Sequence, residues 1–242
     1  MILGFLSDAH GNAVALRRCL EALARLGAGQ TYFLGDATGY LPGETAVLHL
    51  LAGAGIPCLL GNHDAMITGR LPFSEKNEAA YQHRPALARL GEAGLAQLRQ
   101  WTERAEFTLP GPQRFLLVHG DPRNPLEGYL YPDTDLTPLA GQPFDIVVCG
   151  HTHRPFARQA GNVLVINAGS CGLPRDQGDA PSFATYDTVT RQARIHRVRV
   201  SPEETLAGLT PGAPVHASVQ ACLRRQVAPE ALVGEFVGGG QG

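Results

Sequence analysis

Five short polar motifs each follow an apolar run, and this arrangement restricts the fold of the chain more than any other feature of its sequence. When strands lie side by side, the residues at their ends meet at one edge of a sheet, even if they are far apart along the chain. Folding can therefore gather these motifs into one site. The motifs are Asp8-Ala9-His10, Gly35-Asp36, Gly61-Asn62-His63-Asp64, His119-Gly120 and Gly150-His151-Thr152-His153.

The first sixty residues alternate between strand-like and helix-like patterns. Short apolar runs at residues 2–7, 31–34 and 57–60 are typical of strands. Residues 12–26 repeat apolar side chains at helical spacing, and residues 44–52 predict a second helix. This order predicts a mostly parallel sheet that is covered by helices.

The rest of the chain supplies further strands after one helical region. Residues 75–104, which are rich in alanine and leucine, predict one or two helices. The pattern thus favours two layers of sheet with helices outside. Further strands are predicted at residues 114–118, 145–149, 163–167, 182–187 and 193–200.

Residues 1–200 are predicted to form one domain, and residues 201–242 a C-terminal extension. The extension is expected to be partly helical over residues 202–234 and to end in a flexible, glycine-rich segment. A chain of 242 residues with 44% hydrophobic content can bury one substantial core, which favours a single main domain over two small ones.

Charge and composition restrict the partners that we expect. The net charge of −2 gives no global field that attracts nucleic acid or an anionic membrane, so we expect neither stable nucleic-acid binding nor membrane association. The first residues lack the features of a signal peptide, and no apolar run reaches the ~18 residues of a membrane span. The five scattered cysteines suit reduced thiols. These features predict a cytoplasmic protein.

The side chains of the five motifs are of the kinds that bind divalent cations. Asp8 and His10 can direct two ligands to one ion, although an isolated Asp-x-His is more often a helix cap beside an exposed histidine. Asp36 can bridge two cations or serve as a turn residue. Five of the nine histidines fall at strand ends, beside these carboxylates and Asn62, and together they favour a metal site.

In this order the motifs resemble those of the calcineurin-like metallophosphoesterase superfamily, over about residues 1–200. The series Asp-x-His, Gly-Asp-x-x-Gly, Gly-Asn-His-Asp, His-Gly and Gly-His-x-His is specific as a set, although each fragment alone is not. The resemblance is greatest to the small bacterial, phosphodiesterase-type branch. It implies an αββα sandwich of two mixed β-sheets flanked by helices, with a dinuclear metal site at the carboxyl ends of the strands.

The resemblance also implies a role for each motif residue. It makes His63 a catalytic residue that assists the leaving group, with Asp64 orienting its imidazole. Two divalent ions ~3.5–4 Å apart would support in-line attack on phosphorus by a metal-bridging hydroxide. The metal ligands that it implies are Asp8, His10, Asp36 and His153 for one ion, and Asp36, Asn62, His119 and His151 for the other.

The loop that follows the last motif departs from the pattern of the branch. Similar chains have Asn-Pro-Gly-Ser-x-Gly-x-Pro-Arg there, and Ala168 replaces the first proline in this chain, which is expected to loosen the turn. At the end of the loop, Arg175 is a candidate to bind a phosphate through its guanidinium fork. An equally good interpretation is a surface salt bridge from Arg175 to Asp176 or Asp179.

A long loop at residues 120–135 is expected on the side where substrate enters. Arg123 in this loop is a second candidate to bind substrate, and His83-Arg84 is a lesser one. Tyr129 and Tyr131 suit either of two roles, stacking on a nucleobase or covering the core, and the second is the more frequent use of aromatic residues.

The resemblance leaves the substrate open between several phosphate esters. Small size, near-neutral charge and the lack of a large cap domain favour a phosphodiesterase for a small phosphate ester, with cyclic and linear nucleotides as candidates. A phosphomonoesterase or protein phosphatase is the alternative. A non-catalytic scaffold is disfavoured because all seven ligand positions are filled, and a nuclease because no basic stripe is present. The mixed donor set predicts two divalent metal ions, with manganese expected in assays and iron or zinc as alternatives.

Overall fold

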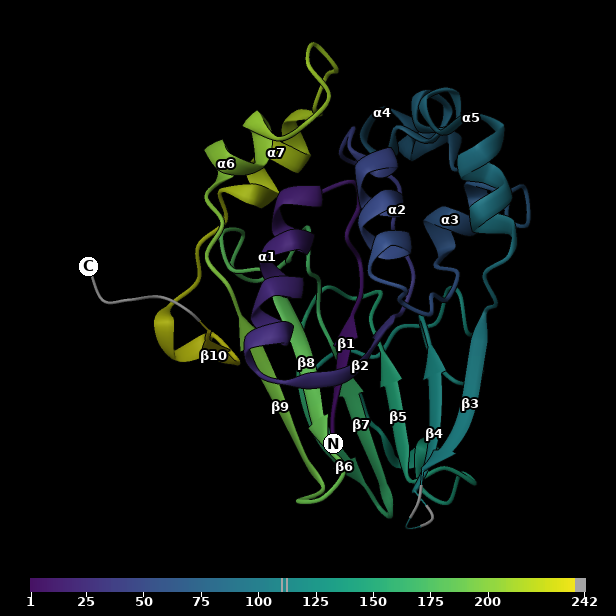
Figure 1. Cartoon of the computed structure of the whole chain (residues 1–242), viewed down its shortest axis with the longest axis vertical. Helices are drawn as coiled ribbons and strands as arrows, with labels where there is room; N and C mark the ends of the chain where they lie inside the picture. The colour runs from purple at the N-terminus through teal and green to yellow at the C-terminus, as the bar shows by residue number, and fades with distance from the viewer. Residues whose placement is uncertain (110, 112, 238–242) are drawn as a thin grey trace.

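Two five-stranded sheets pack face to face in the computed structural model, which describes residues 1–109, 111 and 113–237 (Figure 1). The first sheet contains, in spatial order, β10 (Glu235–Phe236), β9 (Gln192–Arg197), β8 (Ser182–Asp187), β1 (Ile2–Leu6) and β2 (Ala28–Phe33). The second contains β3 (Arg104–Leu109), β4 (Gln113–Val118), β5 (Ile146–Cys149), β7 (Val163–Asn167) and β6 (Phe156–Ala160).

Both sheets are mixed, as the resemblance implied. In the first sheet β1 runs parallel to β2 and antiparallel to β8. In the second sheet β4, β5 and β7 are parallel neighbours, while β3 and β6 are antiparallel edge strands. The carboxyl ends of β1, β2, β4 and β5 therefore lie at the same end of the sandwich (Figure 1).

Helices lie outside the sheets and around the carboxyl ends of the strands (Figure 1). The side chain of Asn12 caps the first of them by accepting a hydrogen bond from the Ala15 N–H (3.1 Å). The helices are α1 (Ala13–Arg25), α2 (Glu44–Gly53), α3 (Asn62–Ile67), α4 (Glu78–Tyr81), α5 (His83–Arg99), α6 (Pro202–Ala207) and α7 (Ala217–Leu223). Three short 3₁₀ helices are η1 (Glu75–Asn77), η2 (Thr137–Leu139) and η3 (Pro229–Ala231).

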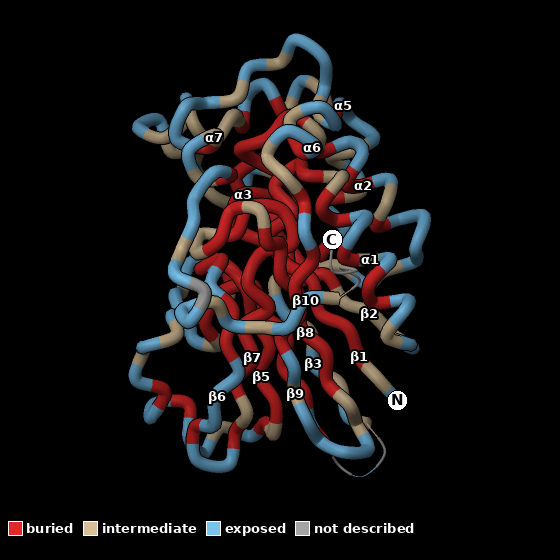
Figure 2. Tube along the Cα trace, turned by 90° about the vertical axis from the view of Figure 1, so that its left-hand side faces the viewer, coloured by how far each residue is buried: buried red, intermediate tan, exposed pale blue. Residues whose placement is uncertain are grey.

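Buried side chains form one layer between the sheets and one on each outer face. Figure 2 shows the buried residues concentrated in the interior of the molecule. Phe5 and Phe115 belong to the cluster of buried side chains between the two sheets. The outer face of the first sheet packs against α1 and α2, through residues such as Leu16. The outer face of the second sheet is covered by Leu130 and by residues around η2. The αββα class expected from the motifs is confirmed.

Several predicted element boundaries differ from the observed ones. Residues 57–60 form only single bridges, to Phe33 and to Thr102, because the segment links the edges of two sheets instead of extending one. The helical region ends at Arg99, and β3 begins at residue 104. In β3, exposed and half-buried residues alternate, as in Glu106 and Phe107. This period of two is expected of a strand. The strand β6 was not predicted.

The segment after β9 contains two short helices within the range predicted for them. Val219 and Leu223 of α7 pack against Tyr40, Leu41 and Leu173, which belong to loops near the carboxyl ends of the strands. The glycine-rich segment 238–242 lies outside the described residues. Within the described part of the chain, no helix combines the length and the apolar character needed to cross a membrane.

Candidate metal centre

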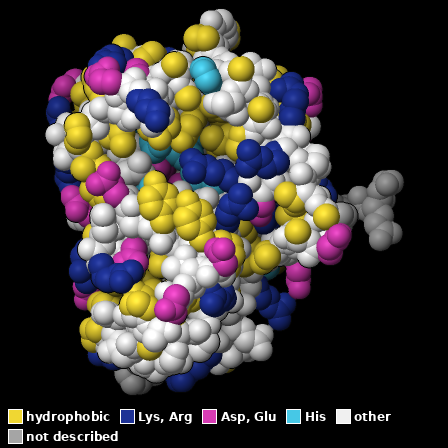
Figure 3. Space-filling model, turned by 180° about the vertical axis from the view of Figure 1, so that it is seen from behind, with side chains coloured by type: hydrophobic (Ala, Val, Ile, Leu, Met, Phe, Trp, Pro, Cys, Tyr) yellow, Lys and Arg dark blue, Asp and Glu magenta, His cyan; other side chains and the backbone are white. Residues whose placement is uncertain are grey.

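The predicted ligands lie together at the carboxyl ends of four strands. Asp8 follows β1, Asp36 follows β2, His119 follows β4 and His151 follows β5. All seven predicted ligands, and also His63 and Asp64, are at most 8% exposed. Figure 3 shows histidine side chains gathered in a hollow on one face of the molecule. Parallel pairing within each sheet therefore assembles the site.

The backbone around the site is held in an unusual conformation. Five of the predicted ligands have a positive φ, a region that non-glycine residues seldom adopt. Hydrogen bonds between neighbouring loops support it, from the Asp8 N–H to the Gly35 carbonyl (2.9 Å) and from the His10 N–H to the Asp36 carbonyl (3.0 Å). The five residues and their φ values are Asp8 (57°), His10 (45°), Asp36 (61°), His151 (64°) and His153 (58°).

Three histidines each direct their Nε2 atom into the site. Each Nδ1 lies against a backbone carbonyl, at 2.8 Å for His10, 2.9 Å for His119 and 2.5 Å for His153. A carbonyl only accepts, so each Nδ1 carries the proton and each Nε2 is left with a lone pair when the ring is neutral. The Nε2 atoms of His10 and His153 are 3.0 Å apart. Two facing lone pairs at this distance require a positive charge near them.

Each carboxylate has one oxygen fixed by the backbone and one that faces imidazoles. Asp8 Oδ2 accepts from the His151 N–H (2.9 Å), while Oδ1 has no hydrogen-bond partner and lies 3.2 Å from His153 Nε2. Asp36 Oδ1 accepts from the His63 N–H (2.9 Å). Its Oδ2 lies 3.3 Å from His119 Nε2 and 3.6 Å from His10 Nε2. Asp36 thus faces ligands of both predicted ions.

Opposite charges within the site shift the pKa values of its carboxylates and imidazoles. Burial alone would raise the pKa of Asp8, but His153 and His119 outweigh burial and hold the pKa well below its usual range. Burial would likewise lower the pKa of His119, but Asp36 and Asp8 raise it to about 9. Burial lowers the pKa of His153 to about 4. Without a metal, the positive charge of a protonated His119 offsets part of the negative charge of Asp8 and Asp36.

Three groups of donors could each hold a metal ion, because the ligand atoms within each group lie within 4.8 Å of one another. Asp36 belongs to two of the groups. Asn62 adds an amide oxygen 3.2 Å from His119 Nε2. Imidazole, carboxylate and amide donors with unpartnered atoms suit divalent first-row ions. The groups are Asp8-His10-His153, Asp36-His119-His151 and His10-Asp36-His63.

Asp64 contacts backbone groups instead of the His63 imidazole that it was expected to orient. Its Oδ2 accepts from the Asp36 N–H (2.7 Å), and its Oδ1 from the Thr38 N–H (3.1 Å) and the Thr38 hydroxyl (2.7 Å). Burial, followed by the charge of Asp36, raises the pKa of Asp64 to about 6. Asp64 therefore fixes the loop that carries Asp36.

The imidazole of His63 is held by His83 instead. His63 Nδ1 lies 2.8 Å from His83 Nε2, and the His83 ring is fully buried. His83 Nδ1 faces Glu78 Oε2 at 3.6 Å. Gly39 leaves room for the ring, because a Cβ there would lie 2.5 Å from His63 Nδ1. The only signal for His83 in the sequence was weak, because a polar residue at the start of a helix is common.

The two predicted substrate-binding arginines lie in different surroundings. Arg175 contacts neither Asp176 nor Asp179 but donates to the Tyr40 hydroxyl (3.0 Å), beside the ring of His10. Asp176 pairs with the buried Arg197. Arg123 forms a fork-like ion pair with Asp121, with N–O distances of 3.0 and 2.8 Å. Arg175 thus borders the centre, while the guanidinium of Arg123 is bonded to a carboxylate.

The loop 167–173 is firmly anchored, contrary to the expectation that Ala168 loosens it. The Ala168 N–H donates to the Cys149 carbonyl (2.9 Å), a hydrogen bond that proline cannot make. The Ser170 hydroxyl donates to the Asp8 carbonyl (2.7 Å). The Leu173 carbonyl accepts from His153 Nδ1. The loop therefore connects the first and last ligand motifs.

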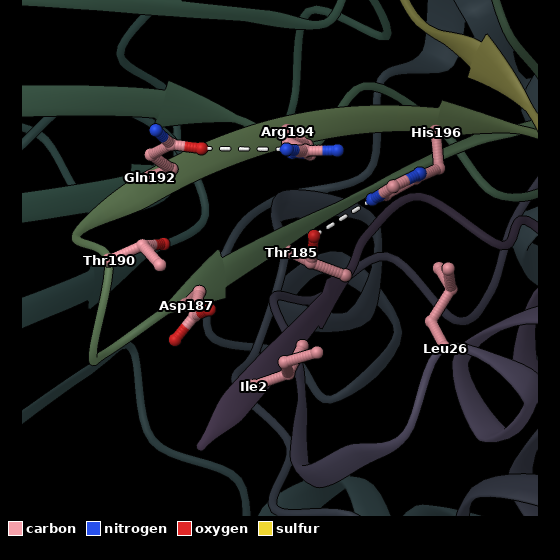
Figure 4. Close-up of a pocket in the computed structure, with 8 residues that line it drawn as sticks. All are labelled: Ile2, Leu26, Thr185, Asp187, Thr190, Gln192, Arg194 and His196. Atoms are coloured by element: carbon pink, nitrogen blue, oxygen red, sulfur yellow. Dashed lines mark hydrogen bonds between the residues drawn. The ribbon is translucent and has the colours of Figure 1, made fainter.

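A separate pocket lies on the first sheet (Figure 4). Ile2, Thr185 and His196 are among its lining residues, and the Thr185 hydroxyl is hydrogen-bonded to His196 Nε2 (2.8 Å). Ile2 begins β1 whereas Asp8 follows its end, which separates them by roughly 20 Å at the rise of a strand. This pocket is therefore not part of the metal centre.

A family model of the calcineurin-like phosphoesterase superfamily domain matches residues 1–191. The chain belongs to this superfamily. The membership confirms the resemblance seen in the motifs. It supports a phosphoesterase, a class of hydrolase, and the family implies divalent metal ions.

Similar proteins cover most of the chain. Phosphodiesterase YfcE of Escherichia coli K12 is 27% identical over 219 residues, which are 84% of this chain and 100% of that protein. A metallophosphoesterase from Sphaerobacter thermophilus is 25% identical, with a TM-score of 0.76, over 92% of this chain and 98% of that one. A hypothetical protein from Pyrococcus horikoshii is 18% identical, with a TM-score of 0.79, over 92% and 97% of the two chains, and shows the same fold.

Proposed function

We propose that this chain is a dinuclear metal-dependent hydrolase that cleaves phosphodiesters. The observation that carries the proposal is the convergence of ligand atoms at one point. Asp8 Oδ1 and His151 Nε2 have no hydrogen-bond partner there, and the Nε2 atoms of His10 and His153 face each other. The name of the E. coli relative, a phosphodiesterase, supports the preference for diesters over monoesters.

In this proposal the ligands form two sets that share Asp36. When bound, two divalent ions would supply Lewis acidity to activate water and would neutralise charge on the phosphoryl group. Manganese is our first candidate, with iron or zinc as alternatives, because mixed nitrogen and oxygen donors accept all three. One set is Asp8, His10, Asp36 and His153, and the other is Asp36, Asn62, His119 and His151.

His63 is proposed as the catalytic residue that faces the leaving oxygen. With its Nδ1 bonded to His83 Nε2, the Nε2 of His63 is the nitrogen left to hold a proton toward substrate. We place the shared proton on His83, which makes His63 the Nε2–H tautomer. His83 is then the residue that orients the His63 imidazole, a role that the resemblance implied for Asp64.

Arg175 is the better placed of the two proposed phosphate-binding arginines. Its side chain is held by Tyr40, whose ring packs 4.7 Å from the ring of His10. A small movement would allow the guanidinium to reach a phosphate oxygen. Arg123 remains a secondary candidate because a substrate phosphate would have to compete with Asp121 for it.

A metal-by-substrate panel on the purified protein tests the proposal. An aryl phosphodiester, its monoester, cyclic nucleotides, dinucleoside polyphosphates and phosphopeptides are each assayed with manganese, iron and zinc. We expect diester hydrolysis and about two metal ions per chain by elemental analysis. Preference for monoesters or phosphopeptides would support a phosphomonoesterase or protein phosphatase instead. Inactivity with every metal would favour a scaffold.

We also propose that the protein acts in the cytoplasm on small phosphate esters, without a stable nucleic-acid or membrane partner. The net charge of −2 and the five free cysteines support this proposal. Cell fractionation with an antibody would test it, and recovery in a membrane or secreted fraction would contradict it.

A further inference from the structure

Tyr129 and Tyr131 form an exposed pair, here called the tyrosine pair, beside the candidate metal centre. Their side chains are 52% and 37% exposed. The two rings are almost parallel, at an interplanar angle of 4°, with centroids 5.7 Å apart. The ring of Tyr129 also lies 4.3 Å from the ring of His151, with a tilt of 39°. Large aromatic surface thus faces solvent next to a proposed metal ligand.

The loop is built so that both rings face outward. Leu130, between the two tyrosines, is only 2% exposed and packs in the same cluster as Val118 and Val147. Its carbonyl accepts from Asn167 Nδ2 (3.3 Å). The Tyr131 N–H donates to the Thr134 hydroxyl (2.8 Å). Because these contacts fix the loop before any ligand arrives, a ligand that stacks there has little conformational entropy to remove.

We propose that the tyrosine pair stacks on the nucleobase of a nucleotide phosphodiester whose phosphate lies at the metal centre. This inference rests on the proposed function and names its substrate class. Every base has a π-face, so aromatic rings bind bases with little sequence preference. A row of neighbouring rings, from His151 through Tyr129 to Tyr131, leads from the candidate metal centre to solvent. Figure 3 shows hydrophobic side chains beside the hollow where histidines gather.

The expected occupant is a single nucleotide unit and not a nucleic-acid polymer. Twenty basic and twenty-two acidic residues give the chain little attraction for a polyphosphate backbone, whose binding depends on many cationic contacts. The exposed surface of the two rings is large enough for one base, or a stacked pair of bases, to lie against it. Cyclic nucleotides and short dinucleotides are therefore the forms that fit both the charge and the tyrosine pair.

Isothermal titration calorimetry with two product-like ligands tests the inference on the manganese-loaded protein. Adenosine 5′-monophosphate and ribose 5-phosphate carry the same phosphate and sugar, and only the first has a base. We expect the nucleotide to bind roughly ten-fold more tightly, and Tyr131→Leu to remove most of that difference while ribose 5-phosphate affinity stays unchanged. Tyr131 is chosen first because Tyr129 also contacts His151.

Two further variants make the test specific. Tyr131→Phe keeps the ring and should keep the preference for the nucleotide. Phe236→Leu changes another exposed aromatic residue, 40% exposed in the edge strand β10, and should have no effect. Equal affinities of the two ligands in the unmodified protein would overturn the inference, as would an unchanged preference in the Tyr129→Leu, Tyr131→Leu double variant. Because binding is measured without turnover, this outcome is independent of whether diesters are hydrolysed.

Discussion

At the residue scale, the candidate metal centre depends on side chains whose backbone is strained. A non-glycine residue held at positive φ costs of order 1–3 kcal/mol, and Asp8, His10 and Asp36 are all held there. Hydrogen bonds from distant loops, such as that from Ser170 to the Asp8 carbonyl, maintain the conformation. The strained backbone conformation is therefore kept at the positions where it directs the ligand atoms toward one another.

Replacing His63 with Ala should lower turnover by about a hundred-fold or more, because a positioned proton donor contributes at least that factor. The variant should still bind both metals, since the two proposed ligand sets do not include His63. Steady-state kinetics and elemental analysis measure the two properties. Unchanged turnover would remove His63 from the proposed mechanism.

His83→Phe should lower kcat about ten-fold without a matching change in KM, because it removes the hydrogen bond that holds the His63 ring. The phenyl ring keeps the packing against Phe73, whose ring lies 5.5 Å from that of His83. His83→Gln, which keeps a polar group, should recover part of the loss. If both variants lose stability and activity equally, His83 has a structural role only.

At the scale of the elements, the loop after β2 and the start of α3 form one unit around a carboxylate. Asp64 accepts hydrogen bonds from Asp36, Thr38 and Gly61, which brings the two segments together. The resemblance placed Asp64 in the site as the residue that orients the His63 imidazole, whereas the structure gives it backbone partners and the Thr38 hydroxyl. Its partners in the loop after β2 are the N–H groups of Asp36 and Thr38 and the Thr38 hydroxyl, which lie far from Asp64 in the sequence, so no local pattern specifies them.

Asp64→Asn should destabilise the fold by about 2 kcal/mol or more, because an amide NH₂ faces buried N–H donors that then lack an acceptor. The free energy of unfolding in urea measures this loss. The metal affinity should fall as well, since the backbone of Asp36 is no longer fixed. Thr38→Val is the matched control because it removes only the hydroxyl contact of 2.7 Å. Equal stability of Asp64→Asn and the unmodified protein would contradict this account.

At the scale of the whole molecule, the buried histidines connect stability to pH. Burial lowers the pKa of His83 and His153 to about 4 and that of His151 to about 3. The unfolded chain binds protons near pH 6.5 but the folded chain does not, so this stability is present above pH 6.5 and is lost as the pH falls toward 4. Asp64, whose pKa is raised to about 6, offsets part of this loss as the pH falls from 6 toward 4. The stability that His119 contributes through its raised pKa of about 9 is lost only as the pH rises toward 9.

The metal-free protein should therefore lose at least about 2 kcal/mol of stability between pH 6.5 and pH 4. Thermal unfolding in the presence of a chelator, followed by circular dichroism across this range, measures the change. A Tm that stays constant or rises as the pH falls would show that the histidines are not desolvated in the way the structure indicates.

The C-terminal extension is proposed to support the centre by packing. Leu223 of α7 contacts the cluster that contains Leu173, whose carbonyl holds His153. Leu223→Ala should cost roughly 3 kcal/mol of unfolding free energy, as expected for a large buried residue. Val233→Ala, at a position that is 45% exposed, is the control and should change little. If the two variants are equally stable, α7 does not support the fold.

The sequence by itself determined the order of most strands and helices, the superfamily and the set of side chains at the strand ends. Short local patterns in the sequence predict these features. Examples are the apolar run before Asp8 and the apolar residues at helical spacing after Asn12. The edge strand β3 was missed although its residues alternate between polar and apolar, because it directly follows a segment with a helical pattern. The edge strand β6 was missed because its three middle residues are exposed, which removes the alternation.

Only the tertiary structure decided which atoms of the site lack a hydrogen-bond partner and which residues position its side chains through hydrogen bonds. It showed that His83, not Asp64, contacts His63, that Ala168 fixes its loop, and that Tyr129 and Tyr131 face solvent. Each of these facts depends on a contact between segments far apart in the chain. The physical reason is that hydrogen-bond partners and burial are properties of the assembled fold, whereas the pattern of a segment records only its own periodicity.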